Sequence, residues 1–347
     1  MNYTQISKTM SRRDFLKLGG AALAALMLPN MPVHAAPEDY EEFFEAPASL
    51  GRVAAWSQVV RRAPSPTAER VGLLARNEVI PLHASVWGEA PWPSNPVWYK
   101  TKGGFVHSGY VQPVENNPSS EVMKYVPKPG AWGQICVPVA KARAAIDSEY
   151  VAWNLYYGTV YRFIKAVRDE DGTWWYQLQE GLSQTPSLYI PASSIRYIPP
   201  EELAPISPGC SDKWIHISIE DQLLTCYEGE QAVFKHRIAS GLWGEMSTPH
   251  GEFRILYKRH TRRMKGEFAG DEYDLPGVPF TNYFTWSGVA IHGTYWHNDY
   301  GRRHSHGCVN LPPESAKWVF RWTEPRINYH EYTREAEPEE GTLVVVT

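Results

Sequence analysis

Short runs of alternating hydrophobic and polar residues, separated by turns, cover most of the chain from about residue 50 onward. The clearest early runs lie at 71–74, 78–82, 98–101 and 104–111. Alternation with a period of two buries one face of a strand, and short strands at this spacing are typical of a small barrel. The pattern therefore predicts a mainly β protein that begins with a small domain at residues 50–116.

A second segment repeats this rhythm. An aromatic run at 174–178 is followed by a hydrophobic run at 189–191, and the order resembles that of the first segment. The repetition predicts a second, diverged domain of the same kind at residues 131–199. The segments 117–130 and 200–212 are rich in Pro, Ser and Glu, which is typical of linkers.

Residues 213–347 form the third predicted domain, which is again mainly β. Hydrophobic runs at 214–219 and 223–227 flank a polar turn and predict a hairpin. One helix is predicted from Glu314 to Trp322, because Pro312 and Pro313 precede it and Pro325 follows it. A last strand is expected at 341–346.

The first 35 residues have the pattern of a targeting segment. Basic residues precede an apolar run at 18–28, and small residues suited to cleavage follow at 33–35. The apolar run covers only 11 positions, whereas a membrane-spanning helix needs about 20. The run around Arg12 and Arg13 resembles the twin-arginine export signal. An acidic linker at 36–49 follows.

Export predicts a periplasmic, cell-wall or extracellular location, with a membrane tether if the signal is not cleaved. Loss of the four basic residues and one acidic residue of 1–35 lowers the formal charge from -4 to -7. This acidic balance argues against nucleic-acid binding. Hydrophobic residues make up 43% and charged residues 21% of the chain, as expected of a soluble globular protein. No cofactor motif is visible.

Four cysteines occur, at positions 136, 210, 226 and 308. Disulfides persist outside the cytoplasm, so a bridge between Cys210 and Cys226 is one interpretation. Burial of Cys136, Cys210 and Cys226 as small apolar residues is the other. A catalytic Cys308 has to stay free under either interpretation.

The densest group of reactive residues lies at 291–294 and 305–311, where His292 precedes Cys308 by sixteen positions. A thiol needs a neighbouring imidazole to take its proton, and a third group has to orient that imidazole. Backbone N–H groups next to a small residue such as Gly307 suit a developing oxyanion. Zinc is an alternative, because imidazole and thiolate are suitable ligands and the region contains His292, His297, His304, His306 and Cys308. Their spacing is irregular, and we expect no metal.

These two motifs resemble the active site of the L,D-transpeptidase family, and the resemblance extends to 239–241 and 248–253 across 213–347. It implies a β-sandwich with one helix after the cysteine. It implies Cys308 as nucleophile, His292 as base and the Gly293 carbonyl as the group that holds the ring. The remaining residues that it places around the oxyanion or the site are Ser305, His306, Gly307 and Asn310. Segments 98–101, 104–107 and 110–113 resemble a bacterial SH3-like domain.

The family resemblance implies a cysteine acyltransferase that acts on peptidoglycan stem peptides, with the cell-wall polymer as a partner of the SH3-like domains. The product would be a 3–3 crosslink, and we expect a monomer without a cofactor. Two alternatives remain: an L,D-carboxypeptidase, in which water accepts the acyl group, and a non-catalytic wall-binding scaffold. Asn310 stands where the family often has Arg, and His250 where it often has Thr.

Aromatic residues near His292 are candidates for substrate binding. These are Tyr283 and Trp296, and His250 is added from the 248–253 motif. Because the chain contains 14 Trp, an ordinary core position is an equal alternative for Trp296. The basic run at 258–265 is predicted as a loop, either a solvated face or a lid that attracts carboxylates.

Overall fold

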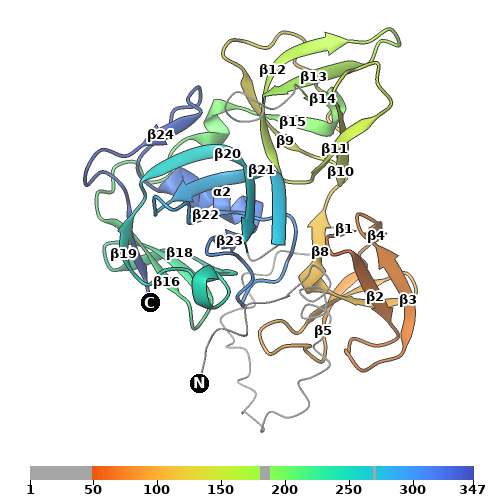
Figure 1. Ribbon diagram of the computed structural model, residues 1–347, viewed down its shortest axis with the longest axis horizontal. Helices are drawn as coiled ribbons and strands as arrows, with labels where there is room; N and C mark the ends of the chain where they lie inside the picture. Colours follow the sequence, from red (N-terminus) through yellow and green to blue (C-terminus); the bar gives the residue numbers. More distant parts are fainter. Residues whose placement is uncertain (1–48, 180–187, 269–270) are drawn as a thin grey trace, which may run out of the picture. The chain divides into compact units, whose positions relative to one another are not determined.

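The computed structural model describes residues 49–179, 188–268 and 271–347. These residues form β-sheets with one α-helix among them, which confirms the predicted mainly β class (Figure 1). The predicted signal and nearly all of the acidic linker lie outside the described residues. No helix in the described ranges is long and apolar enough to cross a membrane.

The first segment contains eight strands in two sheets. The strands are β1 (Leu50–Val53), β2 (Ser57–Arg61), β3 (Arg70–Ala75), β4 (Val79–Pro81), β5 (Ala84–Trp87), β6 (Val97–Thr101), β7 (Gly104–His107) and β8 (Val111–Val114). The sheet orders are β4-β1-β8 and β3-β2-β7-β6-β5, with a short 3-10 helix at Ser108–Tyr110 before β8. Their alternate residues, including Val60, Val106 and Val111, share one small core.

The second segment forms one seven-stranded sheet in the order β11-β10-β14-β13-β12-β9-β15. Its strands are β9 (Ala131–Ile135), β10 (Val139–Arg143), β11 (Val151–Tyr156), β12 (Val160–Arg168), β13 (Trp174–Gln179), β14 (Leu188–Pro191) and β15 (Ile195–Ile198). A separate core lies under this sheet, with Phe163 stacked on Tyr176 at 4.3 Å between ring centroids. Short 3-10 helices follow at Ala192–Ser194 and Pro200–Leu203.

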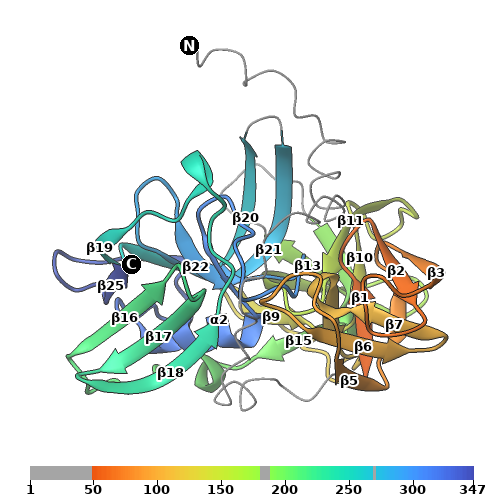
Figure 2. The ribbon, with the colours of Figure 1, turned by 90° about the horizontal axis from the view of Figure 1, so that it is seen from below.

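The C-terminal segment has two five-stranded sheets, in the orders β18-β17-β16-β25-β19 and β23-β22-β21-β20-β24 (Figure 2). The first contains β16 (Lys213–Ser218), β17 (Leu223–Glu228), β18 (Gln231–Arg237), β19 (Gly251–Arg254) and β25 (Leu343–Val346). The second contains β20 (Tyr257–Phe268), β21 (Asp271–Tyr283), β22 (Ala290–Gly293), β23 (Val309–Leu311) and β24 (Thr333–Glu335). A 3-10 helix lies at Gly244–Met246. Residues 264–275, at the ends of β20 and β21, cluster apart from the rest.

Both sheets of this segment share one core with α2 (Pro313–Trp322), which packs against β22 (Figure 1). Pro313 occupies the first helical turn, where its missing N–H costs nothing, and Glu314 there complements the helix dipole. The spacing of Ala316, Val319 and Phe320 places all three on the buried face. The helix predicted from Glu314 is confirmed to within one residue.

The loop expected for the basic run 258–265 is wrong, because this run lies in the long strand β20. Lys258 is 1% exposed, and its Nζ donates to the carbonyl oxygens of Phe320 and Thr323 at the end of α2, the latter at 2.8 Å. Burial lowers the pKa of Lys258 to about 7. The sequence hides the alternation typical of a strand, because the inward-facing residue Lys258 is basic. The carbonyl oxygens that accept from it lie more than sixty residues further along the chain.

The cysteines are free thiols. Cys226 is fully buried in the C-terminal core, and this burial raises its pKa. Cys136 is 6% exposed and Cys210 is partly exposed. The buried apolar interpretation therefore fits Cys226 and Cys136, and no bridge joins Cys210 to Cys226.

We expect Phe320→Ala to lower the free energy of unfolding by about 3–5 kcal/mol, because it removes a ring packed between Phe280 and His260. Urea denaturation followed by tryptophan fluorescence measures the change. Exposed Glu220→Ala is the control and should shift stability by less than about 0.5 kcal/mol. Equal midpoints for the two variants would contradict the proposed core.

Candidate active site

Two short parallel strands bring the predicted base and nucleophile together. In β22 and β23, His292 pairs with Asn310 and Ile291 pairs with Val309. Side chains alternate between the faces of a sheet. Ile291 and Val309 therefore enter the core, while His292 and Asn310 lie on the opposite face, and Cys308 directly precedes β23.

The His292 ring is held in one tautomer. The residue is 2% exposed, and its Nδ1 lies 3.0 Å from the carbonyl oxygen of Gly293, the group predicted for this task. Because a carbonyl only accepts, Nδ1 carries the hydrogen and Nε2 keeps a lone pair. Burial lowers the pKa of His292 to about 4, and the bond to Gly293 partly opposes this shift. The ring is neutral at pH 7, with Nε2 as its basic atom.

Cys308 is partly exposed, but its thiol is enclosed by backbone. The thiol donates to the Gly288 oxygen, with 3.7 Å between sulfur and oxygen. Burial raises the pKa of Cys308 to about 11, and a hydrogen bond from the Ala290 backbone partly opposes the rise. The two groups therefore rest as thiol and neutral imidazole.

The turn before Cys308 is fixed by its own small residues. The Ser305 hydroxyl donates to the Cys308 carbonyl oxygen and accepts from the Gly307 N–H at 3.2 Å. Gly307 has a φ of +116°, a conformation that side chains with a Cβ rarely adopt. His306 is half-buried between them. The positive φ accounts for a glycine at position 307, and the two hydrogen bonds of the hydroxyl account for a serine at position 305.

A second clamp on this turn comes from residues that the motif analysis did not single out. The hydroxyl of Thr248 donates to the Gly307 carbonyl oxygen at 2.8 Å and accepts from the Gly241 N–H at 2.9 Å. Gly241 has no room for a side chain, since a Cβ there would lie 2.2 Å from the Met246 oxygen. Both residues fall within runs that carried the family resemblance, although neither was assigned a role.

Asn310 connects the site to His297. The Asn310 side-chain amide lies 2.9 Å from His297 Nε2, while the Asp299 N–H donates to His297 Nδ1 at 3.1 Å. Burial lowers the pKa of His297, so the ring is neutral and only one of its nitrogens accepts. Nε2 is therefore the donor, and the amide presents its oxygen to it. The NH2 group of Asn310 is left available as a donor.

The predicted substrate residues occupy three different environments. Tyr283 pairs with Ala290, is 5% exposed, and stacks on Tyr257 at 4.2 Å. Its pKa is raised by burial and by the charge that Cys308 carries when ionised. Trp296 lies 5.8 Å from His292 between ring centroids. His250 is exposed and has no contact here that ties it to the other two.

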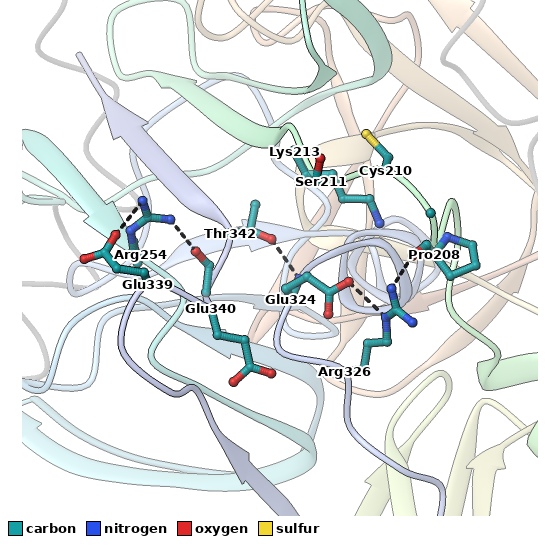
Figure 3. A pocket seen from close by; sticks show the side chains of 12 residues that line it. Pro208, Cys210, Ser211, Lys213, Arg254, Glu324, Arg326, Glu339, Glu340 and Thr342 are labelled. Carbon is teal, nitrogen blue, oxygen red and sulfur yellow. Dashed lines mark hydrogen bonds and ion pairs between the residues drawn. The ribbon is translucent and has the colours of Figure 1, made fainter.

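A cavity of about 320 Å³ lies elsewhere in the C-terminal segment and contains none of these residues (Figure 3). Four of its charged groups form ion pairs with one another, Arg254–Glu339 at 2.9 Å and Arg326–Glu324 at 3.0 Å. Paired charges leave little to recognise a ligand. No group of three or more His, Cys, Asp or Glu in the described ranges is placed to hold a metal ion.

Comparison with known proteins agrees with the motifs. Residues 212–346 match the model of the L,D-transpeptidase catalytic domain, and residues 9–29 match that of the twin-arginine translocation pathway signal sequence. Both resemblances are thereby confirmed for these residues. The SH3-like domains are not matched in this way and stay a prediction.

L,D-transpeptidase 1 of Mycobacterium tuberculosis is 36% identical over 80 residues, which cover 21% of this chain and 32% of that protein. The chain thus spans about a third of the length of this curated relative. Among solved structures, the catalytic domain of the Enterococcus faecium L,D-transpeptidase is 28% identical, covering 39% of this chain and 97% of that chain at a TM-score of 0.31. An L,D-transpeptidase from Mycobacterium smegmatis is 17% identical, covering 52% and 98% at 0.32.

We expect alkylation of Cys308 by iodoacetamide to rise about tenfold per pH unit from pH 6 to 9, because only the thiolate reacts and its pKa is raised to about 11. Peptide mass spectrometry after timed quenching measures the rate at this cysteine. Denatured protein is the control and should level off near pH 9. A rate that is already constant above pH 6 in the folded protein would indicate a thiolate–imidazolium pair instead.

Thr248→Val should lower the free energy of unfolding by about 1–3 kcal/mol, because it leaves the buried N–H of Gly241 without its acceptor. Urea titration measures this loss. Thr248→Ser keeps the hydroxyl and should recover most of it. A Thr248→Val variant as stable as the wild type would contradict the role given to these hydrogen bonds.

Proposed function

We propose that this protein is an exported peptidoglycan L,D-transpeptidase in which Cys308 is the nucleophile and His292 the general base. The observation that carries the proposal is the pairing of β22, which contains His292, with β23, which begins directly after Cys308, together with the His292 Nδ1 hydrogen held by Gly293. This leaves Nε2 as the atom that accepts a proton. The match of residues 212–346 to the catalytic-domain family supports the same assignment.

In the first step, Cys308 sulfur attacks the carbonyl carbon of the third residue of a stem tetrapeptide, and Nε2 of His292 takes the thiol proton. The oxyanion collapses, the bond to the terminal D-alanine breaks, and the imidazolium returns its proton to the leaving amine. A thioester on Cys308 remains. Because both partners start neutral and buried, the step begins without separating charge in the resting site.

In the second step, an amine from another stem peptide attacks the thioester and gives its proton to His292. The carbon–sulfur bond breaks, His292 returns the proton to the sulfur, and the product is a 3–3 crosslink with a free thiol. If water attacks instead, the same site is an L,D-carboxypeptidase. The two reactions share every residue up to the thioester, so the acceptor alone separates them.

The neighbouring residues serve the oxyanion and the shape of the site. The backbone N–H of Cys308 and the turn of His306 and Gly307 lie where charge develops on the carbonyl oxygen. Ser305 fixes that turn through its hydroxyl, and the side chain of Asn310 contacts His297 in the loop after the base strand. These roles are assigned to the positions that match the family motif.

Substrate contacts are assigned by position. Trp296 stands beside the base, and Tyr283 stands in the row of Ala290 and Cys308. We propose both as walls of the stem-peptide site. His250 stays a prediction, since its exposed side chain has no link to the other residues.

The twin-arginine match at residues 9–29 supports export, and we propose that the protein acts in the periplasm or cell wall. The β segments at 50–116 and 131–199 are proposed as SH3-like domains that contact wall polymer. Such contacts would raise the effective concentration of stem peptides near Cys308. We propose a monomer that uses no cofactor.

Incubation of the protein with disaccharide-tetrapeptide should give crosslinked dimers that have lost one D-alanine, measured by mass spectrometry. Cys308→Ala should abolish them, and His292→Gln should lower kcat about 10²–10⁴-fold through loss of the base. Exposed Glu220→Ala is the matched control and should keep full activity.

Tripeptide as the sole product would identify the carboxypeptidase. Dimers formed by Cys308→Ala would contradict the nucleophile. No product from the folded wild-type protein, together with binding of Cys308→Ala to isolated cell walls, would favour the scaffold alternative.

A further inference from the structure

The loop at residues 294–304, called here the catalytic loop, joins the base strand to the nucleophile turn. His292 lies just before it and Cys308 shortly after it. The proposed chemistry uses no side chain of this loop except Trp296. Several of its other buried polar groups nevertheless have partners in the first β segment at residues 49–114.

Asp299 is the central contact. Its carboxylate is fully buried, and Oδ1 accepts from Trp92 Nε1 at 3.1 Å and from Asn95 Nδ2 at 3.3 Å. Its Oδ2 lies 3.4 Å from Arg302 Nε, and the Arg302 guanidinium covers the Trp92 ring at 4.3 Å. Two of the three groups that face this buried charge therefore belong to the first β segment.

The first β segment also holds the residue next to Asp299. The N–H of Asn298 donates to the Gly109 oxygen at 2.7 Å, and the Asn298 side chain donates to the Tyr99 hydroxyl at 3.1 Å. A Cβ at Gly109 would lie 3.1 Å from Asp299 Oδ1, so a larger residue would press on the carboxylate. The loop therefore packs closely against the first β segment at Gly109, with little space for a larger side chain there.

A second anchor lies at the start of the loop. Arg52 is 2% exposed and donates to the Tyr295 carbonyl oxygen. Gln112 accepts from Arg52 at 2.7 Å, and the guanidinium lies 4.3 Å from the centroid of the Tyr156 ring. Tyr156 in turn stacks on Tyr295 at 5.2 Å.

The contacts of the loop continue into the site. The backbone N–H of Asp299 donates to His297, and His297 meets the side chain of Asn310, which pairs with His292. His304 stacks on His297 at 4.1 Å and lies just before the turn of Cys308. Contacts therefore lead from Asp299 to His292 through His297 and Asn310. A second set leads through His297 and His304 to the turn of Cys308.

A buried carboxylate is stable only when its partners stay in place, because desolvation of an unpaired charge is costly. The partners of Asp299 and the buried charge of Arg52 tie the loop to the first β segment. We propose that this segment is a structural part of the catalytic centre, and that Asp299 is a positioning residue that acts through His297 and Asn310. The inference rests on the proposed function for its catalytic readout.

The test uses a short soluble tetrapeptide, so that wall binding by the first segment plays no part. Trp92→Phe removes one donor and keeps the ring, and Asn95→Ala removes the other. We expect kcat to fall at least about tenfold with KM changed less than about twofold, since geometry and not affinity is lost. Leu73→Ala, an exposed position of the same segment, is the matched control and should match the wild type.

Asp299→Asn keeps the acceptor for Trp92 and Asn95, and it should retain more activity than Asp299→Ala. Addition of Asn95→Ala to Asp299→Ala should cost little more than Asp299→Ala alone, because both remove one interaction. Unchanged kcat in Trp92→Phe and Asn95→Ala, or full additivity of the pair, would overturn the proposal.

Alkylation gives a readout that does not depend on transpeptidation. A displaced loop uncovers the thiol, so the rate at Cys308 should rise at least about threefold in Trp92→Phe and Asn95→Ala, because exposure lowers a raised thiol pKa. Fully buried Cys226 should stay unreactive and thereby shows that the fold is intact. If the wild type transfers nothing, the proposed function fails, and a constant Cys308 rate would then overturn this inference separately.

Discussion

The register between β22 and β23 is the constraint on which the rest of the site depends. A shift by one residue would turn His292 into the core and bring Ile291 to the reactive face. The core prevents this, because Ile291, Val309 and the buried face of α2 share one apolar cluster. Hydrophobic packing, including that of the helix after the cysteine, thus fixes the positions of the proposed reactive residues.

Burial sets the protonation of the pair. The environment that excludes water from His292 also favours a neutral thiol, so no stored ion pair drives the reaction. Reactivity has to come from proximity, from the oriented Nε2 and from backbone donors at the oxyanion. The Gly293 carbonyl then has a catalytic meaning, since it fixes which nitrogen is basic.

The sequence predicted much of this, but unevenly. The helix at Pro313–Trp322 and the hairpin of β16 and β17 follow from local periodicity and proline placement, so they were predictable. The strand character of 258–265 was not, because the acceptors of Lys258 are carbonyl oxygens of a distant helix end. The pair Cys308 and His292 came from motif resemblance. The hydrogen bonds of Thr248 and those of Asp299 join segments that are distant in the sequence. No local sequence pattern predicts them.

The raised pKa of Cys308 has a further consequence for an exported protein. Oxidants and disulfides outside the cytoplasm react with thiolates, and at pH 7 a thiol with a pKa of about 11 is ionised in only about one molecule in ten thousand. The enclosed sulfur is therefore slow to oxidise or to form mixed disulfides while the site is empty. Burial therefore protects the thiol proposed as the nucleophile from oxidation.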